Sequence, residues 1–309
     1  EALPRQYESM KLFVEAEIRK MGKKNLWIGP SLGDWLAMGK GIAWQAMHNN
    51  PVSNAFIVHD LKVISETAER LGKKADADRY RRQLEATTKA YIEKFVSKKG
   101  IVAKDYQSAY IMALKFVLPE GELRELVKKN FAANIRKNGL QTGFFATEHL
   151  LPLLVEAGET ELAYDILLQE GCPGWMYQIK CGATTTWERW DALKPDGTVN
   201  EEKMAGSGDN MVSFNHYAFG SVGEFYYQYI LGIKPQKPGF AELHFEPYPD
   251  RRLGGVSGSY LSRAGKIESS WKYEEDGCHI SLNTPVKSEV VLPNGQRETV
   301  EEGTYQWLC

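Results

Sequence analysis

The sequence lacks any hydrophobic run long enough to cross a bilayer. Its longest apolar stretches, such as residues 150–155, fall far short of the roughly 20 residues that a transmembrane helix needs. It also lacks an excess of either charge, because 38 Lys and Arg stand against 40 Asp and Glu, and it presents no basic face for a polyanion. We therefore expect a globular protein with neither a membrane nor a nucleic acid as its partner.

Cysteine is scarce, and the usual metal-binding patterns are absent. The four cysteines form no C-x-x-C pair and have no histidine at ligand spacing, so we expect no metal site. Cys172 and Cys181 could form a disulfide in an oxidising compartment, but we favour free thiols.

Common catalytic motifs are missing as well. The sequence contains no G-x-S-x-G elbow, no P-loop, no G-x-G-x-x-G after a strand and no H-E-x-x-H. These absences exclude the commonest hydrolase, NTPase, dehydrogenase and metalloprotease classes. We expect no cofactor.

Aromatic residues, in contrast, are plentiful, with 8 Trp, 15 Tyr and 12 Phe. Many lie between residues 175 and 229, where the segment 182–191 places Glu188 between Trp187 and Trp190. Indole faces stack on the C–H faces of pyranose rings, and a carboxylate between them can acquire a pKa suited to acid or base catalysis. The alternative is a surface loop with two partly buried tryptophans and a solvated pair of Glu188 and Arg189.

The first two thirds of the chain show the apolar spacing of amphipathic helices. Short links between consecutive helices make them antiparallel neighbours, and paired helices in series predict a toroid or an α-solenoid. Because no fixed sequence repeat is found, we favour a closed toroid of divergent hairpins. The expected helices cover residues 1–22, 54–71, 80–95, 106–118, 120–137, 147–157 and 159–169.

Two further segments complete the helical part. Residues 172–213 lose the helical period, so we expect a long functional loop there, followed by a final buried helix over 214–231.

A linker with the sequence Lys-Pro-Gln-Lys-Pro-Gly begins at residue 234. Beyond it the apolar period is two, and Asp-Gly and Asn-Gly pairs predict hairpin turns. We therefore expect a mainly α protein, with a helical toroid over 1–233 and an antiparallel β-sandwich over 234–309.

Acidic residues are the first candidates for chemistry. A glycosidase needs two carboxyl groups beside the scissile bond, about 6.5–9.5 Å apart in inverting enzymes. Glu188 is our first candidate, and its alternative is a surface or helix-capping role beside Arg189. Asp34, in the Gly- and Trp-rich loop 27–36, is the second, and its alternative is a turn in which Asp34 caps a backbone amide. Asp191 fits structural pairing with Arg189 better than sugar binding.

His216 and several tryptophans are candidate sugar contacts. His216 opens the predicted final helix, where its imidazole could bond a sugar hydroxyl, although a lone histidine on an apolar helix is often a satisfied core residue. Trp35, Trp187 and Trp190 could be stacking platforms. Trp175 could be another, but core packing explains it nearly as well.

Four blocks of the sequence resemble the α-L-rhamnosidase family of inverting glycoside hydrolases. The resemblance implies an (α/α)6-barrel catalytic domain followed by a β-sandwich, and a rhamnose-containing oligosaccharide or glycoside as the substrate. The blocks are Gly33-Asp34-Trp35-Leu36, Thr142-Gly143-Phe144 with Leu150-Leu151-Pro152, Ala183 to Asp191, and Ser213 to Val222.

Roles follow from this resemblance residue by residue. Glu188 is expected to be the general base that activates the attacking water. Trp35 and His216 are expected to contact the rhamnose, and Trp187 and Trp190 to wall the pocket. Asp34 is carried over as a substrate-binding residue.

One departure from the family pattern concerns the general acid. The family's acid lies in a block of the form Arg-Asp-Glu-Arg followed by Gly-Trp-Thr-Gly-Asp, and no such block occurs here. The pattern also predicts about eight helices, where six hairpins need twelve. We therefore expect the C-terminal part of a longer enzyme, whose missing N-terminal part would be a partner, and we expect the isolated chain to be inactive or nearly so.

Two other functions stay open at this point. One is a non-catalytic carbohydrate-binding or scaffold protein, and the other is a six-hairpin glycosidase that acts on glucosides or uronides. Neither the aglycone, the oligomeric state nor the compartment, cytoplasmic or periplasmic, follows from the sequence.

Overall fold

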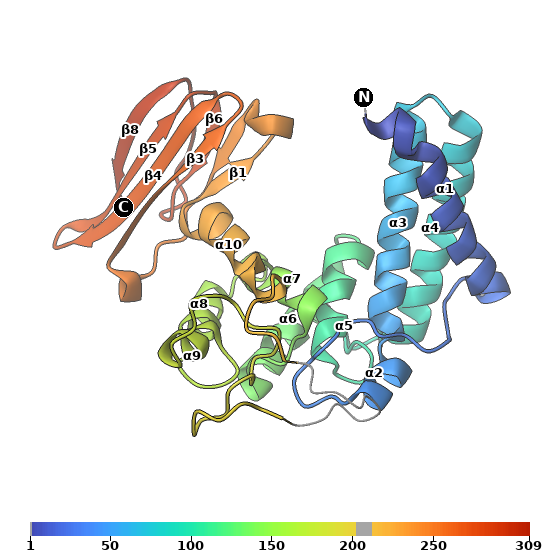
Figure 1. Cartoon of the computed structure of the whole chain (residues 1–309). Coiled ribbons are helices and arrows are strands. Elements are labelled where there is room, and N and C mark those ends of the chain that lie inside the picture. The colour runs from blue at the N-terminus through green and yellow to red at the C-terminus, as the bar shows by residue number, and fades with distance from the viewer. Residues whose placement is uncertain (1, 202–211) are drawn as a thin grey trace. The chain divides into compact units, whose positions relative to one another are not determined.

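A computed structural model describes residues 2–201 and 212–309 of the chain. The chain divides into two compact units, Glu1–Phe219 and Gly220–Cys309, which we call the helical unit and the β unit (Figure 1). The predicted domains, 1–233 and 234–309, divide the chain at another point and remain a prediction. A mainly α protein with a smaller β part is what the sequence predicted.

The helical unit consists of consecutive helices, and several of them pack as antiparallel neighbours. Helix α3 packs against α1 and α4, and α7 packs against α8; the short links predicted the pair α3 and α4 and the pair α7 and α8. The helices are α1 (Ala2–Met21), α2 (Ile42–His48), α3 (Asn50–Arg70), α4 (Lys74–Phe95), α5 (Gln107–Met112) continued by a π-helix (Ala113–Val117), α6 (Glu122–Asn138), α7 (Phe144–Glu156), α8 (Thr160–Leu168) and α9 (Trp175–Lys180).

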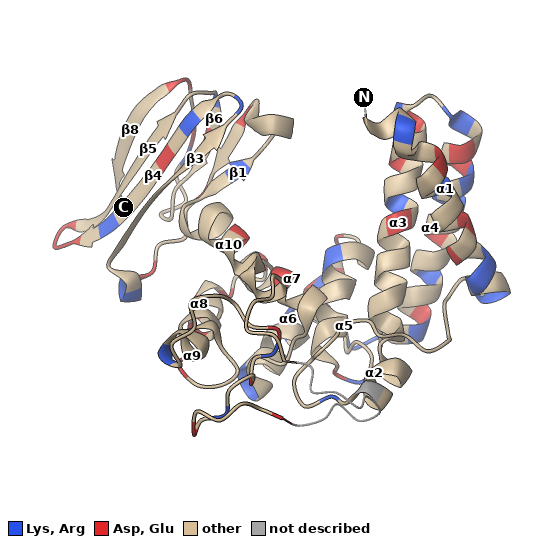
Figure 2. Ribbon diagram, in the orientation of Figure 1, with Lys and Arg blue, Asp and Glu red and all other residues tan. Residues whose placement is uncertain are grey.

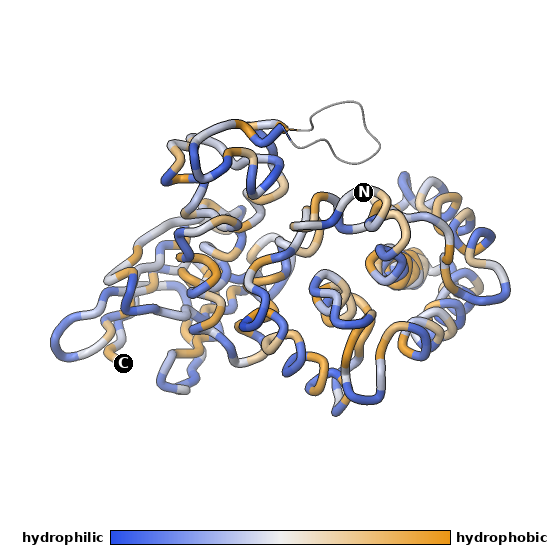
Figure 3. Tube along the Cα trace, turned by 90° about the horizontal axis from the view of Figure 1, so that it is seen from below, coloured by the Kyte–Doolittle hydropathy of each residue, from blue (hydrophilic) through white to orange (hydrophobic). Residues whose placement is uncertain are grey.

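The amphipathic pattern explains how these helices pack. In α1, Tyr7 and Val14 are buried against Leu61 of α3 and Tyr80 of α4, because apolar residues about one or two turns apart share a helix face. Figure 3 shows hydrophobic and hydrophilic residues alternating along the helices of this unit.

Charged residues of both signs lie along α1 and α4 (Figure 2). Two ion pairs join these helices, Lys11 to Asp76 and Arg79 to Glu15, each with an N–O distance of 2.7 Å. The pairs lie at the edge of the apolar contact and stabilise it only modestly, because exposed ion pairs contribute about 0–1 kcal/mol.

Some local predictions were wrong. Helices α2 and α9 were not expected. The predicted helix 214–231 begins only at Ala218, with a 3-10 turn (Ala218–Ser221), then α10 (Val222–Phe225) and a π-helix (Tyr226–Ile230). Of the predicted loop 172–213, residues 202–211 lie outside the described part of the chain.

The β unit contains two four-stranded sheets with strand orders β1-β2-β6-β7 and β3-β4-β5-β8. Most neighbours are antiparallel, but β2 and β6 pair in parallel. The predicted turns at Asp276-Gly277 and Asn294-Gly295 connect β4 to β5 and β6 to β7. The strands are β1 (Ile233–Pro235), β2 (Leu243–Phe245), β3 (Gly255–Ser262), β4 (Gly265–Glu274), β5 (Gly277–Thr284), β6 (Ser288–Val291), β7 (Arg297–Val300) and β8 (Gly303–Leu308).

The segment before β1 belongs with this unit through buried hydrogen bonds. The indole of Trp271 donates to the carbonyl of Ile230 at 2.6 Å, and the hydroxyl of Ser269 donates to the carbonyl of Leu231 at 2.6 Å.

All four cysteines are free thiols, as favoured from the sequence. Across the described ranges, none of the helices combines the length and the apolar character that a membrane span requires.

Candidate functional site

Asp34 is fully buried, and both oxygens of its carboxylate accept hydrogen bonds. One oxygen accepts from the hydroxyl of Ser108 at 2.6 Å and from the amide of Gly143 at 2.7 Å. The other accepts from the amides of Phe145 and Ala146 at 2.8 and 3.0 Å. Gly143 is the N-cap residue of α7, and Phe145 and Ala146 belong to its first turn, so Asp34 caps this helix from a distant loop.

The environment of Asp34 has opposing effects on its pKa. Burial raises the pKa of this carboxyl, and the four hydrogen bonds oppose that rise. Because protein donors surround both oxygens, the carboxylate offers no free oxygen to a ligand. The geometry therefore supports the capping alternative given for Asp34 from the sequence, with a helix in place of a turn.

The backbone beside Asp34 runs antiparallel to the segment before α7. Phe144 donates its amide to the carbonyl of Trp35 at 3.0 Å, and Met38 donates to that of Gln141 at 3.3 Å. The chains approach so closely that a Cβ on Gly143 would stand 2.2 Å from the oxygen of Trp35. Only glycine fits at this position.

A second backbone pairing joins the segment around Glu188 to the segment around His216, two blocks that were predicted to be separate parts of the site. Glu188 donates its amide to the carbonyl of Ser213, and His216 donates to that of Thr186, both at 2.9 Å. The hydroxyl of Thr186 also donates to the carbonyl of His216 at 2.6 Å. His216 therefore lies in an irregular segment before the 3-10 turn and not at the start of a helix, because its backbone is held by Thr186.

Glu188 is partly exposed. In the described ranges its carboxylate has neither a hydrogen bond nor an ion pair. Its neighbour Arg189 binds Asp191 through two hydrogen bonds of 3.0 Å each, and Asn200 donates to Asp191 at 2.8 Å. The predicted pairing of Asp191 with Arg189 is confirmed, and this pairing leaves Glu188 without the arginine.

The tryptophans beside Glu188 lie in the core. Trp190 is fully buried, stacks on Phe219 with 3.8 Å between ring centroids, and donates from its indole to the carbonyl of Thr142 at 3.0 Å. Trp187 is 3% exposed and packs on the edge of Phe214. Trp175 is buried too. None of these three offers an open face for stacking on a sugar, so the geometry supports a packing role that fixes the loop of Glu188.

His216 and Trp35 both contact Phe144, His216 through its ring and Trp35 through a backbone hydrogen bond. The imidazole of His216 lies 4.6 Å from the ring of Phe144, centroid to centroid, and the amide of Ala218 donates to its Nδ1 at 3.3 Å. In the neutral ring the proton is therefore on Nε2, which can donate to a ligand. Phe144 and Trp35 both line a cavity of about 850 Å³.

This cavity lies in the helical unit and is mostly apolar, with two acidic groups and one lysine, Lys20. Glu17 of α1 and Asp60 of α3 line it. Burial, together with the charge of Asp60, raises the pKa of Glu17 to about 7, and burial also raises the pKa of Asp60. Neither Glu188 nor His216 lines this cavity, so the predicted sugar contacts divide into two groups that meet at Phe144.

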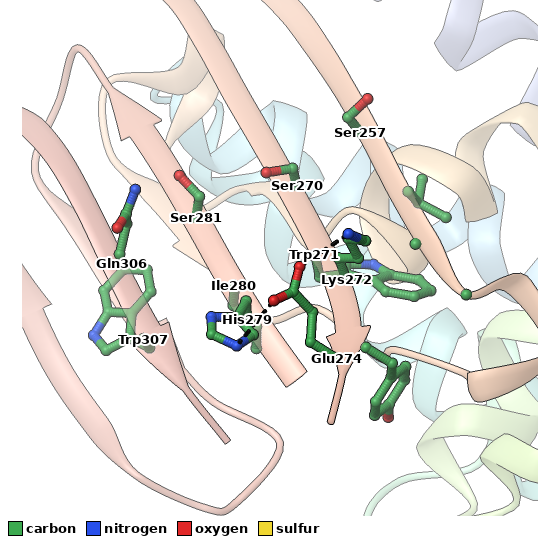
Figure 4. Close-up of a pocket in the computed structure, with 14 residues that line it drawn as sticks. Ser257, Ser270, Trp271, Lys272, Glu274, His279, Ile280, Ser281, Gln306 and Trp307 are labelled. Carbon is green, nitrogen blue, oxygen red and sulfur yellow. Dashed lines mark hydrogen bonds and ion pairs between the residues drawn. The ribbon is translucent and has the colours of Figure 1, made fainter. Parts of the chain in front are cut away.

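The β unit has its own hollow, of about 770 Å³, on the sheet that contains β3, β4, β5 and β8 (Figure 4). Beside it Glu274 pairs with Lys272 at 2.9 Å and with His279 at 3.8 Å. The polar side chains in register across the four strands are Ser257, Ser270, Ser281 and Gln306. No predicted site residue lies here, and we assign the hollow no function.

Glu274, Asp276 and His279 are the three side chains of the described ranges that could jointly hold a metal ion. All three are on the surface, and His279 already pairs with Asp276 at 2.7 Å. Such exposed groups are ordinary surface pairs, so we assign no metal site.

Sequence reasoning missed Phe144 and Ser108 as parts of the site. Phe144 belongs to a block that carried the family resemblance, but no role was predicted for it. Ser108 lies in a buried helix and had no sequence signal, because its contact with Asp34 joins residues 74 positions apart. The pair Gly143-Phe144 was the available signal, since a glycine before a helix often marks close backbone approach.

Comparisons with known proteins agree with this architecture. Residues 1–230 match the family model of the bacterial alpha-L-rhamnosidase 6 hairpin glycosidase domain, and residues 232–306 match that of the bacterial alpha-L-rhamnosidase C-terminal domain. A curated alpha-L-rhamnosidase from Alteromonas sp. (strain LOR) is 34% identical over 298 residues, which are 93% of this chain and 32% of the relative.

Solved structures show the same fold. The native α-L-rhamnosidase of Aspergillus terreus superposes with a TM-score of 0.88 at 28% identity, over 98% of this chain and 36% of that one. The Streptomyces avermitilis α-L-rhamnosidase complexed with L-rhamnose superposes with a TM-score of 0.87 at 28% identity, over 98% of this chain and 30% of that one. The chain thus spans about a third of the length of these proteins, and the predicted fold class is confirmed.

Proposed function

The chain belongs to the bacterial α-L-rhamnosidase family of six-hairpin glycosidases, and from this we propose that it serves the inverting hydrolysis of terminal α-L-rhamnosides. In this proposal the chain supplies the general base and part of the rhamnose-binding surface. The observation that carries it is the Glu188 carboxylate, which is partly exposed and free of protein partners within the described ranges, in a segment whose backbone pairs with that of residues 213–216.

The chemistry assigns a distinct task to each group. An inverting glycosidase removes a proton from water with one carboxylate while the water attacks the anomeric carbon, and a second carboxyl group protonates the leaving oxygen. Glu188 has the accessible oxygens that the base requires. His216 has an Nε2–H that can donate to a rhamnose hydroxyl, and Trp35 is partly exposed and lines the cavity.

The proton donor is the other half of the mechanism. Asp34 is unsuited to it, because its carboxylate is enclosed by protein donors. We propose that the general acid lies outside this sequence, as the missing family block indicates. The 309-residue chain alone would then bind rhamnose and hydrolyse an alkyl rhamnoside negligibly, since nothing protonates the alkoxide leaving group.

Calorimetric titration with L-rhamnose tests the proposal. We expect binding by the wild-type chain, weaker binding by Glu188→Gln and His216→Ala, and no change for Glu201→Gln, a matched exposed carboxyl. Binding that survives Glu188→Gln unchanged would favour a non-catalytic carbohydrate-binding protein.

An assay with methyl α-L-rhamnoside, whose alkoxide leaving group needs a proton, tests the placement of the acid. Turnover by the isolated chain at the rate of an ordinary glycosidase, abolished by Glu188→Gln, would mean that this chain contains its own proton donor.

A further inference from the structure

A small pocket of about 290 Å³ in the helical unit has a chemistry that the proposed function leaves unused. It lies between α2 and the start of α5, and its volume is near the lower limit of ligand sites, about 300 Å³. A single sugar ring is therefore a better match than an extended ligand. The lining residues are Lys40, Trp44, His48, Ala103, Lys104, Asp105, Tyr106, Gln107 and Gln141.

The charged groups of this pocket are mainly cationic, although the whole chain has a formal charge of −2. Lys40 and Lys104 form no ion pair within the described part of the chain. The one carboxylate, that of Asp105, accepts a hydrogen bond from the hydroxyl of Tyr110 at 2.9 Å. Two ammonium groups without a carboxylate partner favour an anionic ligand.

The aromatic groups fix one of these cations and provide an apolar wall. The Nζ of Lys40 lies 4.6 Å from the ring centroid of Trp44, a distance at which the ring attracts an ammonium group. The ring of Tyr106 meets Trp44 edge-on at 5.1 Å. His48 also stacks with Trp44, with 4.5 Å between the ring centroids and an angle of 7°.

The floor of the pocket is held in an unfavourable backbone conformation. Ala103, Lys104 and Asp105 are three consecutive non-glycine residues with φ values of 44°, 58° and 73°. Left-handed backbone is disfavoured for side-chain-bearing residues and tends to occur at functional sites. The hydrogen bonds that hold it run from Ala103 to Phe95 at 2.8 Å and from Asn134 to the carbonyl of Asp105 at 3.0 Å.

The pocket is connected to the candidate sugar site by the paired segments 35–38 and 141–144. Lys40 follows Trp35 by five residues, so their backbones are at most about 17 Å apart. Gln141 lines the pocket and lies three residues before Phe144. A glycan that places rhamnose near Trp35 could therefore place another of its sugar rings here.

We propose that this pocket binds an anionic monosaccharide unit, a pyranose with a carboxylate or a sulfate, through Lys40 and Lys104. The C–H face of the ring would lie against the aromatic wall, and Gln141 would bond to a hydroxyl group. The inference rests on the proposed function in taking this unit to be part of the same glycan as the rhamnose.

Titration of the 309-residue chain with simple glycosides tests the pocket. The probes are a methyl hexuronoside, the 6-sulfate of the matching methyl hexoside, the neutral methyl hexoside and inorganic sulfate. We expect the uronoside or the sulfated hexoside to bind at least about tenfold more tightly than the neutral hexoside, since a charge-assisted hydrogen bond is worth about that factor. Whichever of the two binds more tightly identifies the anionic group. Equal binding of the neutral hexoside, or equally tight binding of inorganic sulfate, would overturn the proposal.

Charge variants locate the binding. The double substitution Lys40→Met and Lys104→Met keeps the alkyl stems and should weaken binding of the anionic glycoside about tenfold. The matched control, Lys62→Met with Lys129→Met, removes two other exposed lysines of the helical unit and should leave binding unchanged. An equal loss in the control would mean that net charge alone attracts the ligand, which would also overturn the proposal.

The two proposals fail separately. The variant His216→Ala should weaken rhamnose binding and leave the anionic glycoside unaffected. If the chain binds the anionic glycoside but not rhamnose, the proposed function is wrong and the proposed role of the pocket is retained. If the chain binds rhamnose but not the anionic glycoside, only the proposed role of the pocket is wrong.

Discussion

In the loop of residues 27–36 the acid is buried and Trp35 is partly exposed, whereas in the loop of residues 182–191 the acid is partly exposed and both tryptophans are buried. The two loops have similar compositions, each with an acid next to tryptophan. Asp34 accepts four hydrogen bonds, and Glu188 accepts none from the described residues. A carboxylate is thus structural in one loop and available for chemistry in the other.

The contrast teaches that the neighbours in space decide the role of an acid. Asp34 faces the first turn of α7, where unpaired amides attract a carboxylate. Glu188 is held by its backbone amide, and Arg189, the cation next to it in the sequence, is occupied by Asp191. The buried indoles fix the loop and leave its acid free.

Removing the buried acid should have the largest effect. We expect Asp34→Ala to lower the free energy of unfolding by about 3–5 kcal/mol, because amides of α7 lose their acceptor inside the protein. Urea unfolding of the variant and of the wild type measures this difference in the free energy of unfolding. The matched substitution Glu188→Ala should change the value by less than about 0.5 kcal/mol. Similar losses in both variants would remove the contrast between the loops.

For the tryptophans, substitution in the loop of residues 182–191 should lower the free energy of unfolding more than substitution in the loop of residues 27–36. We expect Trp190→Phe to cost about 2 kcal/mol, because it leaves a small cavity and orphans the carbonyl of Thr142. Trp35→Phe, at a partly exposed position, should cost less than about 1 kcal/mol. Thermal or urea unfolding of both variants checks this. A larger loss at Trp35 would show that its ring is also a core element.

Glu17 extends the comparison to pH. Its pKa is raised to about 7 from an ordinary value of 4.5, so the folded state binds the proton more tightly than the unfolded state. The associated stability is fully present below pH 4.5 and is lost as the pH rises through 7. We expect the free energy of unfolding of Glu17→Gln to decrease less with rising pH than that of the wild type. At pH 8 the variant should be more stable by about 1 kcal/mol, a value that allows for solvent screening.

Unfolding at several pH values between 4 and 8 measures this effect. Glu201→Gln, an exposed control, should follow the wild-type curve. A Glu17→Gln curve parallel to that of the wild type would show that the carboxyl is solvated and not desolvated.

The smallest expected effect concerns backbone strain in a third loop. Ala103 has a φ of 44°, so Ala103→Gly should relieve strain and raise the free energy of unfolding by about 0.5–1 kcal/mol, once the greater freedom of glycine in the unfolded chain is subtracted. Because no charge changes, binding of an anionic glycoside should persist. Destabilisation would mean that the methyl group packs and that the strain is minor.

Much of the fold could be predicted from local patterns. The apolar stripe with Tyr7 and Val14 placed α1, and the pair Asp276-Gly277 placed the turn between β4 and β5. His216 shows the limit of this approach. Its neighbours have the composition of a buried helix, but a non-local backbone pairing with Thr186 holds it in an irregular segment, and no local period reveals such a pairing.

The sequence by itself determined the helical pairs, the change to period two after the linker, and the blocks that identify the family, because spacing and composition are local properties. Only the tertiary structure decided which acid is enclosed and which is available. Asp34 meets the amide of Gly143 across 109 positions, and Trp190 is buried through Thr142 and Phe219. Burial depends on what packs against a side chain, and here the packing partners are distant in sequence.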